Sequence, residues 1–229
     1  MLLNPSSFKN NPSHYGSVEL YDRIGSWHDL PIPFTKEFGW ERWGLMGVLA
    51  DFVLYYTQGD IIEIGIGESS LYFTRLARKY GRKVYHCDFQ KSDYENLCTV
   101  PDFFDESNIL YVGSSNEFFR DVKFKQDQIA LAFIDGDHLH SQVRRDFENV
   151  FYYLVDNGYI FFHDMYPKDE GELDENRSGD GYLVRKELER RDDVDVITFP
   201  RSSWDAGLTV LRKIPKNAPY YQESGRKND

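Results

Sequence analysis

Charged and metal-capable side chains follow two apolar runs in the second half of the chain. Asp135, Asp137 and His138 come directly after one run, and His163 and Asp164 come directly after the next. Both runs predict buried strands, and parallel strands joined by a single helix are usually neighbours in the sheet. Carboxylate oxygens and an imidazole that meet at one sheet edge can bind Mg²⁺ or Mn²⁺, and these hard ligands disfavour a thiolate-bound metal.

An acidic residue and two glycines mark an earlier junction, in the stretch IIEIGIGESSL that begins at residue 61. The isoleucines predict a strand buried on both faces, and the apolar spacing after Ser69 predicts a helix. In open α/β sheets such a junction binds ligands, because the strand end and the helix N–H groups face one crevice. Gly65 and Gly67 would let a ligand approach the backbone. Glu63 indicates a ligand with a cationic part, and we include Ser69 among the expected contacts.

Two further strand ends carry polar residues. Asp88 ends the predicted strand 82–88, about 20 residues after the glycines, where an acidic side chain can accept hydrogen bonds from the ribose hydroxyls of an adenosine ligand. Ser114 follows the predicted strand 108–113. Its hydroxyl either lies beside an adenine ring or caps the next helix, and the sequence leaves both open.

The pattern of apolar runs predicts one α/β domain over residues 37–214, in which helices alternate with strands. Residues 1–36 are rich in proline, serine and asparagine and are predicted to form an irregular arm, while 215–229 form a tail. A helix over 37–58 is expected to pack on the sheet. The polar segment 166–181 is either a mobile loop over the site or a plain surface loop.

Several other polar residues are expected to be structural. His86 and His140 are interpreted as hydrogen-bonded residues without a catalytic role. Asp137 could bind an ion, cap the next helix or turn the chain, and we favour the cap. Asp146, on the helix between the two metal-capable strands, is expected to be either solvated or at the edge of the packing.

Composition excludes some classes of partner. The chain has 229 residues and a formal net charge of −11, which disfavours binding to nucleic-acid phosphates or to anionic lipid. Two cysteines are too few for a disulfide framework, so we expect reduced thiols and a cytoplasmic protein. No apolar run approaches the length of a membrane span. We expect a small-molecule partner, with a homo-oligomer left open.

The motifs together resemble a known family. The E-x-G-x-G element at Glu63, the run I-D-G-D-H ending at His138, the V-x-x-D-F element on the following helix and N-G-Y-I-F-F-H-D ending at Asp164 are similar to class I S-adenosylmethionine-dependent methyltransferases. Within that class they resemble the O-methyltransferases that tailor antibiotics and macrolide sugars. The similarity extends from Asp60 to Tyr166, with a weaker match at Ala206–Arg212. It implies a Rossmann-like fold with a mostly parallel seven-stranded sheet, helices on both faces and an antiparallel last strand.

The resemblance also implies roles for individual residues. Glu63, Gly65 and Gly67 would hold the methionine end of the methyl donor, S-adenosylmethionine, and Asp88 would hold its ribose. Asp135 and Asp164 would bind a divalent metal, with His163 standing where several relatives have a carboxylate. His138 would be the base that takes the proton from the substrate hydroxyl. We count Asp135 among the donor-binding and catalytic residues too. His163 in place of a carboxylate and Asn157 in place of a glycine depart from the family pattern.

The implied reaction is methyl transfer to a hydroxyl of a small polar molecule, such as a sugar or a natural-product intermediate. One alternative is a nicotinamide-dependent oxidoreductase, which is disfavoured because Ser70 stands where the dinucleotide fingerprint needs a third glycine. Another is a protein that binds the donor without catalysis. Nucleic acid as the acceptor is disfavoured by the acidity and by the absence of an N/D-P-P-Y/F motif.

Overall fold

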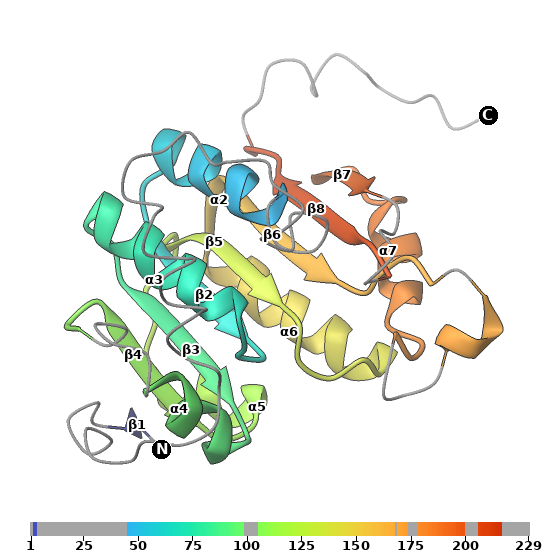
Figure 1. Cartoon of the computed structure of the whole chain (residues 1–229). Helices are drawn as coiled ribbons and strands as arrows, with labels where there is room; N and C mark the ends of the chain where they lie inside the picture. The colour runs from blue at the N-terminus through green and yellow to red at the C-terminus, as the bar shows by residue number, and fades with distance from the viewer. Residues whose placement is uncertain are drawn as a thin grey trace.

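The computed structural model describes residues 2–3, 45–98, 105–167, 169–173, 178–199 and 206–216. Nearly all of the predicted N-terminal arm and of the C-terminal tail lies outside these residues. The described residues form one sheet with helices on both faces (Figure 1).

The sheet has eight strands, which pair in the order β1-β4-β3-β2-β5-β6-β8-β7. Strands β2 to β6 run parallel to their neighbours, whereas β8 is antiparallel to both β6 and β7, and β1 is antiparallel to β4. The strands are β1 (Leu2–Leu3), β2 (Asp60–Ile64), β3 (Val84–Asp88), β4 (Asn108–Val112), β5 (Ile129–Ile134), β6 (Leu154–His163), β7 (Val194–Phe199) and β8 (Leu208–Lys213).

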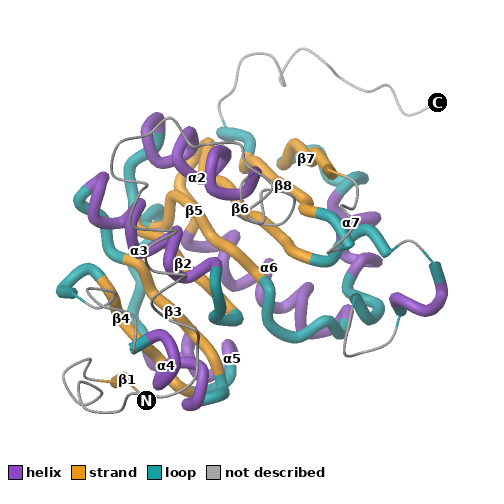
Figure 2. The backbone as a smooth tube through the Cα atoms, in the orientation of Figure 1, coloured by secondary structure: helices purple, strands orange, loops and turns teal. Residues whose placement is uncertain are grey.

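The helices lie on both sides of this sheet (Figure 2). On one face α2 and α3 pack against each other and against the central strands, and on the other face α5, α6 and α7 do so. The helices are α2 (Leu45–Tyr56), α3 (Ser69–Tyr80), α4 (Lys91–Leu97), α5 (Ser115–Asp121), α6 (His140–Tyr153) and α7 (Tyr182–Leu188), with a short 3₁₀ turn, η5, at Glu170–Glu172.

Each central strand is buried because side chains from both of its faces enter a core. Along β2, Ile62 and Ile64 join the cluster under α5, α6 and α7, while Ile61 joins the cluster under α2 and α3. Alternation along a strand places Glu63 on the same face as Ile61, beneath α3. A charged residue in a buried strand therefore points into the protein and needs partners there.

The sequence predicted this architecture well. The Rossmann-like fold, all seven predicted strands and the antiparallel last strand are confirmed. The prediction of an irregular arm was wrong for Leu2–Leu3, whose backbone pairs with β4 as an eighth strand. Of the predicted helix over 37–58, residues 45–56 are helical and 37–44 lie outside the described residues. In the described part of the chain, no helix has the length and apolar character needed to cross a membrane.

Candidate active site

The carboxyl ends of four adjacent parallel strands form the site. The order β3-β2-β5-β6 brings these ends together, and β2 and β5 are the pair at which the chain changes direction across the sheet. Open α/β sheets bind ligands at such a switch point. Most of the expected donor-binding residues lie at the ends of β2 and β3, while Ser114 follows β4. The metal-capable residues, Asp135 among them, lie at the ends of β5 and β6.

Asp88 ties the glycine turn to the end of β3. Its Oδ2 accepts a hydrogen bond from the Ile66 N–H at 2.9 Å, and its Oδ1 accepts one from the Gln90 N–H at 2.8 Å. Burial raises the pKa of Asp88, although these N–H donors favour the ionised form and oppose that rise. A carboxylate has about four lone-pair sites, so Asp88 keeps capacity to accept a hydrogen bond from a diol such as a ribose.

The two glycines of the turn meet different surroundings. Gly65 has a φ of +84°, and a Cβ there would lie 2.1 Å from the carbonyl oxygen of Asp135. A side chain is therefore excluded at Gly65 by the protein itself. A Cβ on Gly67 would meet nothing within 4 Å, so this glycine borders open space. Of the two, Gly67 has the surroundings expected for backbone that a ligand approaches.

Glu63 and Ser69 are turned inward. The Ser69 hydroxyl donates to Glu63 Oε1 at 2.6 Å, and His86 Nδ1 lies 2.6 Å from Glu63 Oε2. The Glu63 side chain is 0% exposed, and His86 is 1% exposed. Both carboxylate oxygens thus have partners inside the protein. The structural interpretation of His86 is confirmed.

Ser114 and Asp137, which precede two helices near the site, have different roles. Ser114 is the N-cap of α5 and forms a capping box with Glu117, which is the capping alternative that the sequence left open. Asp137 accepts a hydrogen bond from the Leu139 N–H at 2.8 Å, so it turns the chain, and our preference for a helix cap was wrong. The first N–H of α6, that of His140, is bonded instead by Asp180 Oδ1 at 2.5 Å.

The second half of the site is a cluster of two carboxylates and two imidazoles, which we call the acidic cluster: Asp135, His138, His163 and Asp164. His163 Nδ1 lies 3.1 Å from Asp135 Oδ1 and 3.3 Å from Asp164 Oδ2. His138 Nε2 lies farther from the same oxygens, at 3.8 and 3.9 Å, and these separations are too long for hydrogen bonds. This Nε2 atom is buried and has no hydrogen-bond partner within the described residues.

The charges of the acidic cluster are strongly coupled. Burial alone would raise the pKa of Asp135, but His163 and His138 outweigh it and hold that pKa well below its usual range. Burial lowers the pKa of His138, yet Asp135 and Asp164 reverse this effect, so its pKa lies above the ordinary value. The protein therefore favours an ionised Asp135 beside a basic imidazole.

Asp164 is held in an uncommon backbone conformation. Its φ is +56°, in the left-handed region, and its Oδ1 accepts a hydrogen bond from the Ala206 N–H at 2.9 Å. Non-glycine residues with such φ values occur at functional sites when the surrounding structure enforces them. Asn157 also has a positive φ, of +60°. Asparagine tolerates this region, which explains why it can stand where a glycine is common.

The segment after residue 177 closes one side of the acidic cluster. Ser178 and Gly181 line the same pocket as Asp135, His138 and Asp164. The Gly181 N–H donates to the His138 carbonyl at 2.8 Å. The described end of the loop 166–181 therefore contacts the site, although its mobility remains a prediction. Sequence reasoning missed Ser178 and Gly181, because only tertiary contact reveals them.

Two other polar residues have more definite surroundings than expected. Asp146 is 1% exposed and accepts a hydrogen bond from Gln142 Nε2 at 2.9 Å, so the prediction of a solvated residue was wrong. Burial raises the pKa of Asp146 to about 6. His140 Nε2 lies 2.9 Å from Glu187 Oε1 on α7, which confirms its structural role.

An exposed aromatic residue at the donor side was also missed. Phe89, directly after Asp88, is 74% exposed. A large apolar side chain with so little burial contributes little to folding. Its position next to a strand-end acid is the signal that the sequence offered.

Comparisons with known proteins agree with this geometry. Residues 62–165 match a family described as a methyltransferase domain. A protein from Corynebacterium glutamicum superposes with a TM-score of 0.61 and 13% identity, over 92% of this chain and 95% of its own. The O-methyltransferase TomG from Streptomyces achromogenes, solved with SAM, gives 0.58 and 15%, over 92% and 94% of the two chains.

An O-methyltransferase from Bacillus cereus, solved with SAH, superposes with a TM-score of 0.56 and 15% identity, over 88% of this chain and 92% of its own. No curated protein matches the sequence. Residues 62–165 therefore resemble a methyltransferase domain, and the described residues have the α/β fold of these solved structures.

Proposed function

We propose that the protein transfers a methyl group from S-adenosylmethionine to a hydroxyl of a small polar molecule, such as a sugar or a natural-product intermediate. The methyltransferase domain at residues 62–165 supports the reaction class. The names of two structural neighbours, both O-methyltransferases solved with SAM or SAH, support the donor and the acceptor atom.

One observation carries the proposal. Asp88 and the glycine turn lie at the ends of β3 and β2, and the acidic cluster follows the next two strands of the same edge, β5 and β6. Adjacent strands are about 4.8 Å apart, so a donor bound at the first pair would present its methyl group to an acceptor at the second pair.

On the donor side, Asp88 would accept hydrogen bonds from the ribose hydroxyls. Gly67 would face the methionine part, because its Cα borders open space. Phe89 would pack against the adenine, since apolar area as exposed as this is stabilised by burial under a ligand. Ser114, already engaged as a helix cap, would contact the adenine edge only through its backbone or its remaining lone pair.

The acidic cluster fits a divalent cation. One ligand atom from each of Asp135, His138 and Asp164 lies within 4.8 Å of the other two. The His138 Nε2, at 3.8 and 3.9 Å from the two carboxylates, is buried without a hydrogen bond in the described residues. We propose Asp135 and Asp164 as ligands of Mg²⁺ or Mn²⁺. His163 remains the predicted third ligand, although its side chain is only 4% exposed, against 20% for His138. Bound there, the ion would lower the pKa of the acceptor hydroxyl.

His138 can serve either as the base or as a ligand, because both roles need the same nitrogen. We propose that it is the base, with Asp135 keeping the imidazole basic. A His138→Ala variant separates the two roles. If His138 is the base, Mn²⁺ affinity stays within about threefold while turnover falls. If it is a ligand, Mn²⁺ affinity itself falls by about 10-fold or more.

The protein has a limited chemical task in this reaction. The donor supplies a methyl group that is already activated by the sulfonium, and transfer is an in-line displacement. Asp88 and the glycine turn would fix the donor, the acidic cluster would orient the acceptor hydroxyl, and His138 would take its proton. Correct positioning of two reactants alone can supply much of the rate enhancement.

Two alternatives make different predictions. A nicotinamide-dependent oxidoreductase would be stabilised by NAD and not by S-adenosylhomocysteine in a thermal-shift assay, and our proposal predicts the reverse. A donor-binding protein without catalysis would bind S-adenosylhomocysteine but transfer no methyl group to any hydroxylated compound.

We further propose that the acceptor is a small molecule and not a nucleic acid, and that the protein acts in the cytoplasm. The net charge of −11 supports the first point, because it opposes binding to a phosphate backbone. Both cysteines are free thiols in the structure, which supports the second. A homo-oligomer remains compatible with these observations.

The test of the proposal is methyl transfer itself. The protein is incubated with S-adenosylmethionine carrying a labelled methyl group and a panel of sugars and hydroxylated natural products, with and without Mg²⁺. We expect label in at least one product, with a mass increase of one methyl group. No transfer to any compound, together with tight S-adenosylhomocysteine binding, would favour the non-catalytic alternative.

A further inference from the structure

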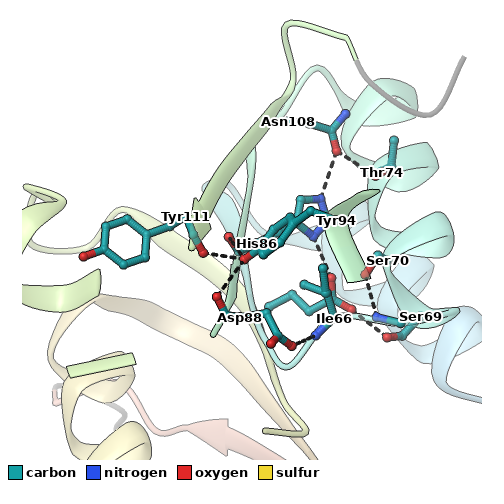
Figure 3. A network of polar contacts seen from close by, with 11 residues as sticks. Ile66, Ser69, Ser70, Thr74, His86, Asp88, Tyr94, Asn108 and Tyr111 are labelled. Carbon is teal, nitrogen blue, oxygen red and sulfur yellow. Dashed lines mark hydrogen bonds and ion pairs between the residues drawn. The ribbon is translucent and has the colours of Figure 1, made fainter. Parts of the chain in front are cut away.

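A chain of buried hydrogen bonds lies directly beneath the glycine turn (Figure 3). It runs from Ser69 at the start of α3 to Glu63 on β2, then to His86 on β3 and Asn108 on β4, where Thr74 of α3 rejoins it. All five residues are at most 5% exposed. These hydrogen bonds therefore link the neighbouring strands β2, β3 and β4 to two positions near the start of α3, Ser69 and Thr74.

The direction of these hydrogen bonds follows from Asn108. Its amide nitrogen donates to Asp105 Oδ1 at 3.1 Å, so its Oδ1 faces the other way. That oxygen accepts from Thr74 Oγ1 at 2.7 Å and from His86 Nε2 at 2.9 Å. His86 therefore carries a proton on Nε2. The reverse amide orientation would place the Asn108 oxygen against a carboxylate and is excluded.

One further proton lies between Glu63 and His86. Because Nε2 is a donor, the 2.6 Å contact of Nδ1 with Glu63 Oε2 holds a proton that either atom can carry. In both forms the pair is neutral as a unit and completely hydrogen-bonded. A buried carboxyl group with these partners has no need of an external cation.

We propose that His86 is a positioning residue for the donor, acting through Glu63 and Ser69 on the turn 65–69; the link to the donor rests on the proposed function. Glu63, held by His86, fixes the Ser69 hydroxyl and hence the first turn of α3. Asp88 fixes the same turn from β3 through the Ile66 N–H. Glu63 thus affects donor binding by holding the backbone of the turn in place, and it does not contact the ammonium group of the donor directly.

Isosteric substitution distinguishes positioning from direct contact. In Glu63→Gln the amide oxygen can still accept from Ser69, and the amide nitrogen can donate to Nδ1 of a neutral His86. The geometry survives while the charge is lost. A carboxylate that pairs with the donor's ammonium would lose its main interaction in the same variant.

The experiment measures S-adenosylhomocysteine affinity by calorimetry and amide hydrogen exchange in a peptide covering 65–71. We expect Glu63→Gln to keep its affinity within about threefold, and His86→Gln, whose amide cannot reach Glu63, to lose about 10-fold or more. Ser69→Ala removes only a hydroxyl and should weaken binding by about three- to tenfold. Leu211→Ala, a core change on β8, is the control, since it should lower thermal stability without altering donor affinity.

Hydrogen exchange tests the inference without any donor. In the free protein, His86→Gln and Ser69→Ala should accelerate exchange at 65–71 more than Leu211→Ala does. Unchanged exchange and affinity in both variants would overturn the positioning role. A loss of 30-fold or more in Glu63→Gln would overturn it in favour of direct contact. If the unaltered protein bound no S-adenosylhomocysteine, the proposed function would fail, while the exchange data would still decide the role of His86.

Discussion

Two groups of histidines and carboxylates lie near the same sheet edge, and they differ in how completely their hydrogen bonds are formed. In the Glu63–His86 pair every ring nitrogen and carboxylate oxygen has a partner inside the protein, and both side chains are at most 1% exposed. In the acidic cluster His138 Nε2 has carboxylate oxygens only at 3.8 and 3.9 Å, and the side chains of Asp135 and Asp164 are about one-fifth exposed.

The difference separates structural from chemical roles. A buried polar pair with complete hydrogen bonds is stable without a ligand and serves to fix the backbone around it. Buried polar atoms whose partners lie beyond hydrogen-bond distance indicate a group that is missing, such as an ion or a substrate. Residue types alone do not distinguish these cases, since both groups combine the same two kinds of side chain.

The largest expected effect comes from His138 in the acidic cluster. His138→Ala should reduce turnover by about 10²–10⁴, the usual contribution of an acid or base, while S-adenosylhomocysteine affinity stays unchanged. Steady-state kinetics and calorimetry on the same preparation measure both. Full activity in this variant would assign the base to another residue and remove the main contrast with His86.

Substitution of one metal ligand should have the next largest effect. Asp164→Asn should lower Mn²⁺ affinity by about 10- to 100-fold in calorimetry, because one ligand oxygen is lost, and EDTA should abolish methyl transfer by the unaltered protein. Asp156→Asn is the matched control, since this exposed aspartate lies in the part of β6 remote from the site. Activity that persists in EDTA would refute a metal requirement.

Asp146 tests whether a buried carboxyl group can lower the stability of the folded protein without taking part in catalysis. Its folded pKa of about 6 exceeds the ordinary value of about 3.9, so the folded state binds the proton more tightly. The contribution of this group to the free energy of unfolding is fully present below about pH 4 and is lost as the pH rises to about 6. Asp146→Asn lacks this loss, so its stability relative to the unaltered protein should rise by about 2 kcal/mol between pH 4 and pH 7.

Denaturant unfolding of both proteins at the two pH values measures this difference, and all other carboxyl groups cancel in the comparison. Equal pH dependence in the two proteins would show that Asp146 is not held with a raised pKa.

His140 should show the smallest effect. It lies two residues after His138, but its Nε2 pairs with Glu187 at the surface, with 26% and 43% of the two side chains exposed. Exposed pairs of this kind contribute about 0–1 kcal/mol. His140→Ala should therefore change turnover by less than about threefold, which makes it the control for His138→Ala. A large loss of activity would extend the catalytic group beyond the acidic cluster.

Local patterns in the sequence predicted the fold and the strand ends, for physical reasons. Runs of β-branched residues that are apolar on both faces are typical of buried parallel strands. Because such strands are neighbours in the sheet, Asp88, Asp135 and Asp164 lie at one edge of it. Contacts between distant segments could not be predicted in this way. Three features depend on packing between elements far apart in the chain: the contact of Gly181 with His138, the burial of Asp146 and the partner of Glu63 on β3.

The donor crevice at the ends of β2 and β3 is the central claim, and a calorimetric titration of S-adenosylhomocysteine tests it most directly. The unaltered protein should bind the ligand, Asp88→Ala should bind it well over 10-fold more weakly, and Asp93→Ala, on the neighbouring helix α4, should bind it unchanged. Absence of binding to the unaltered protein, or equal affinity in the Asp88→Ala variant, would contradict the account.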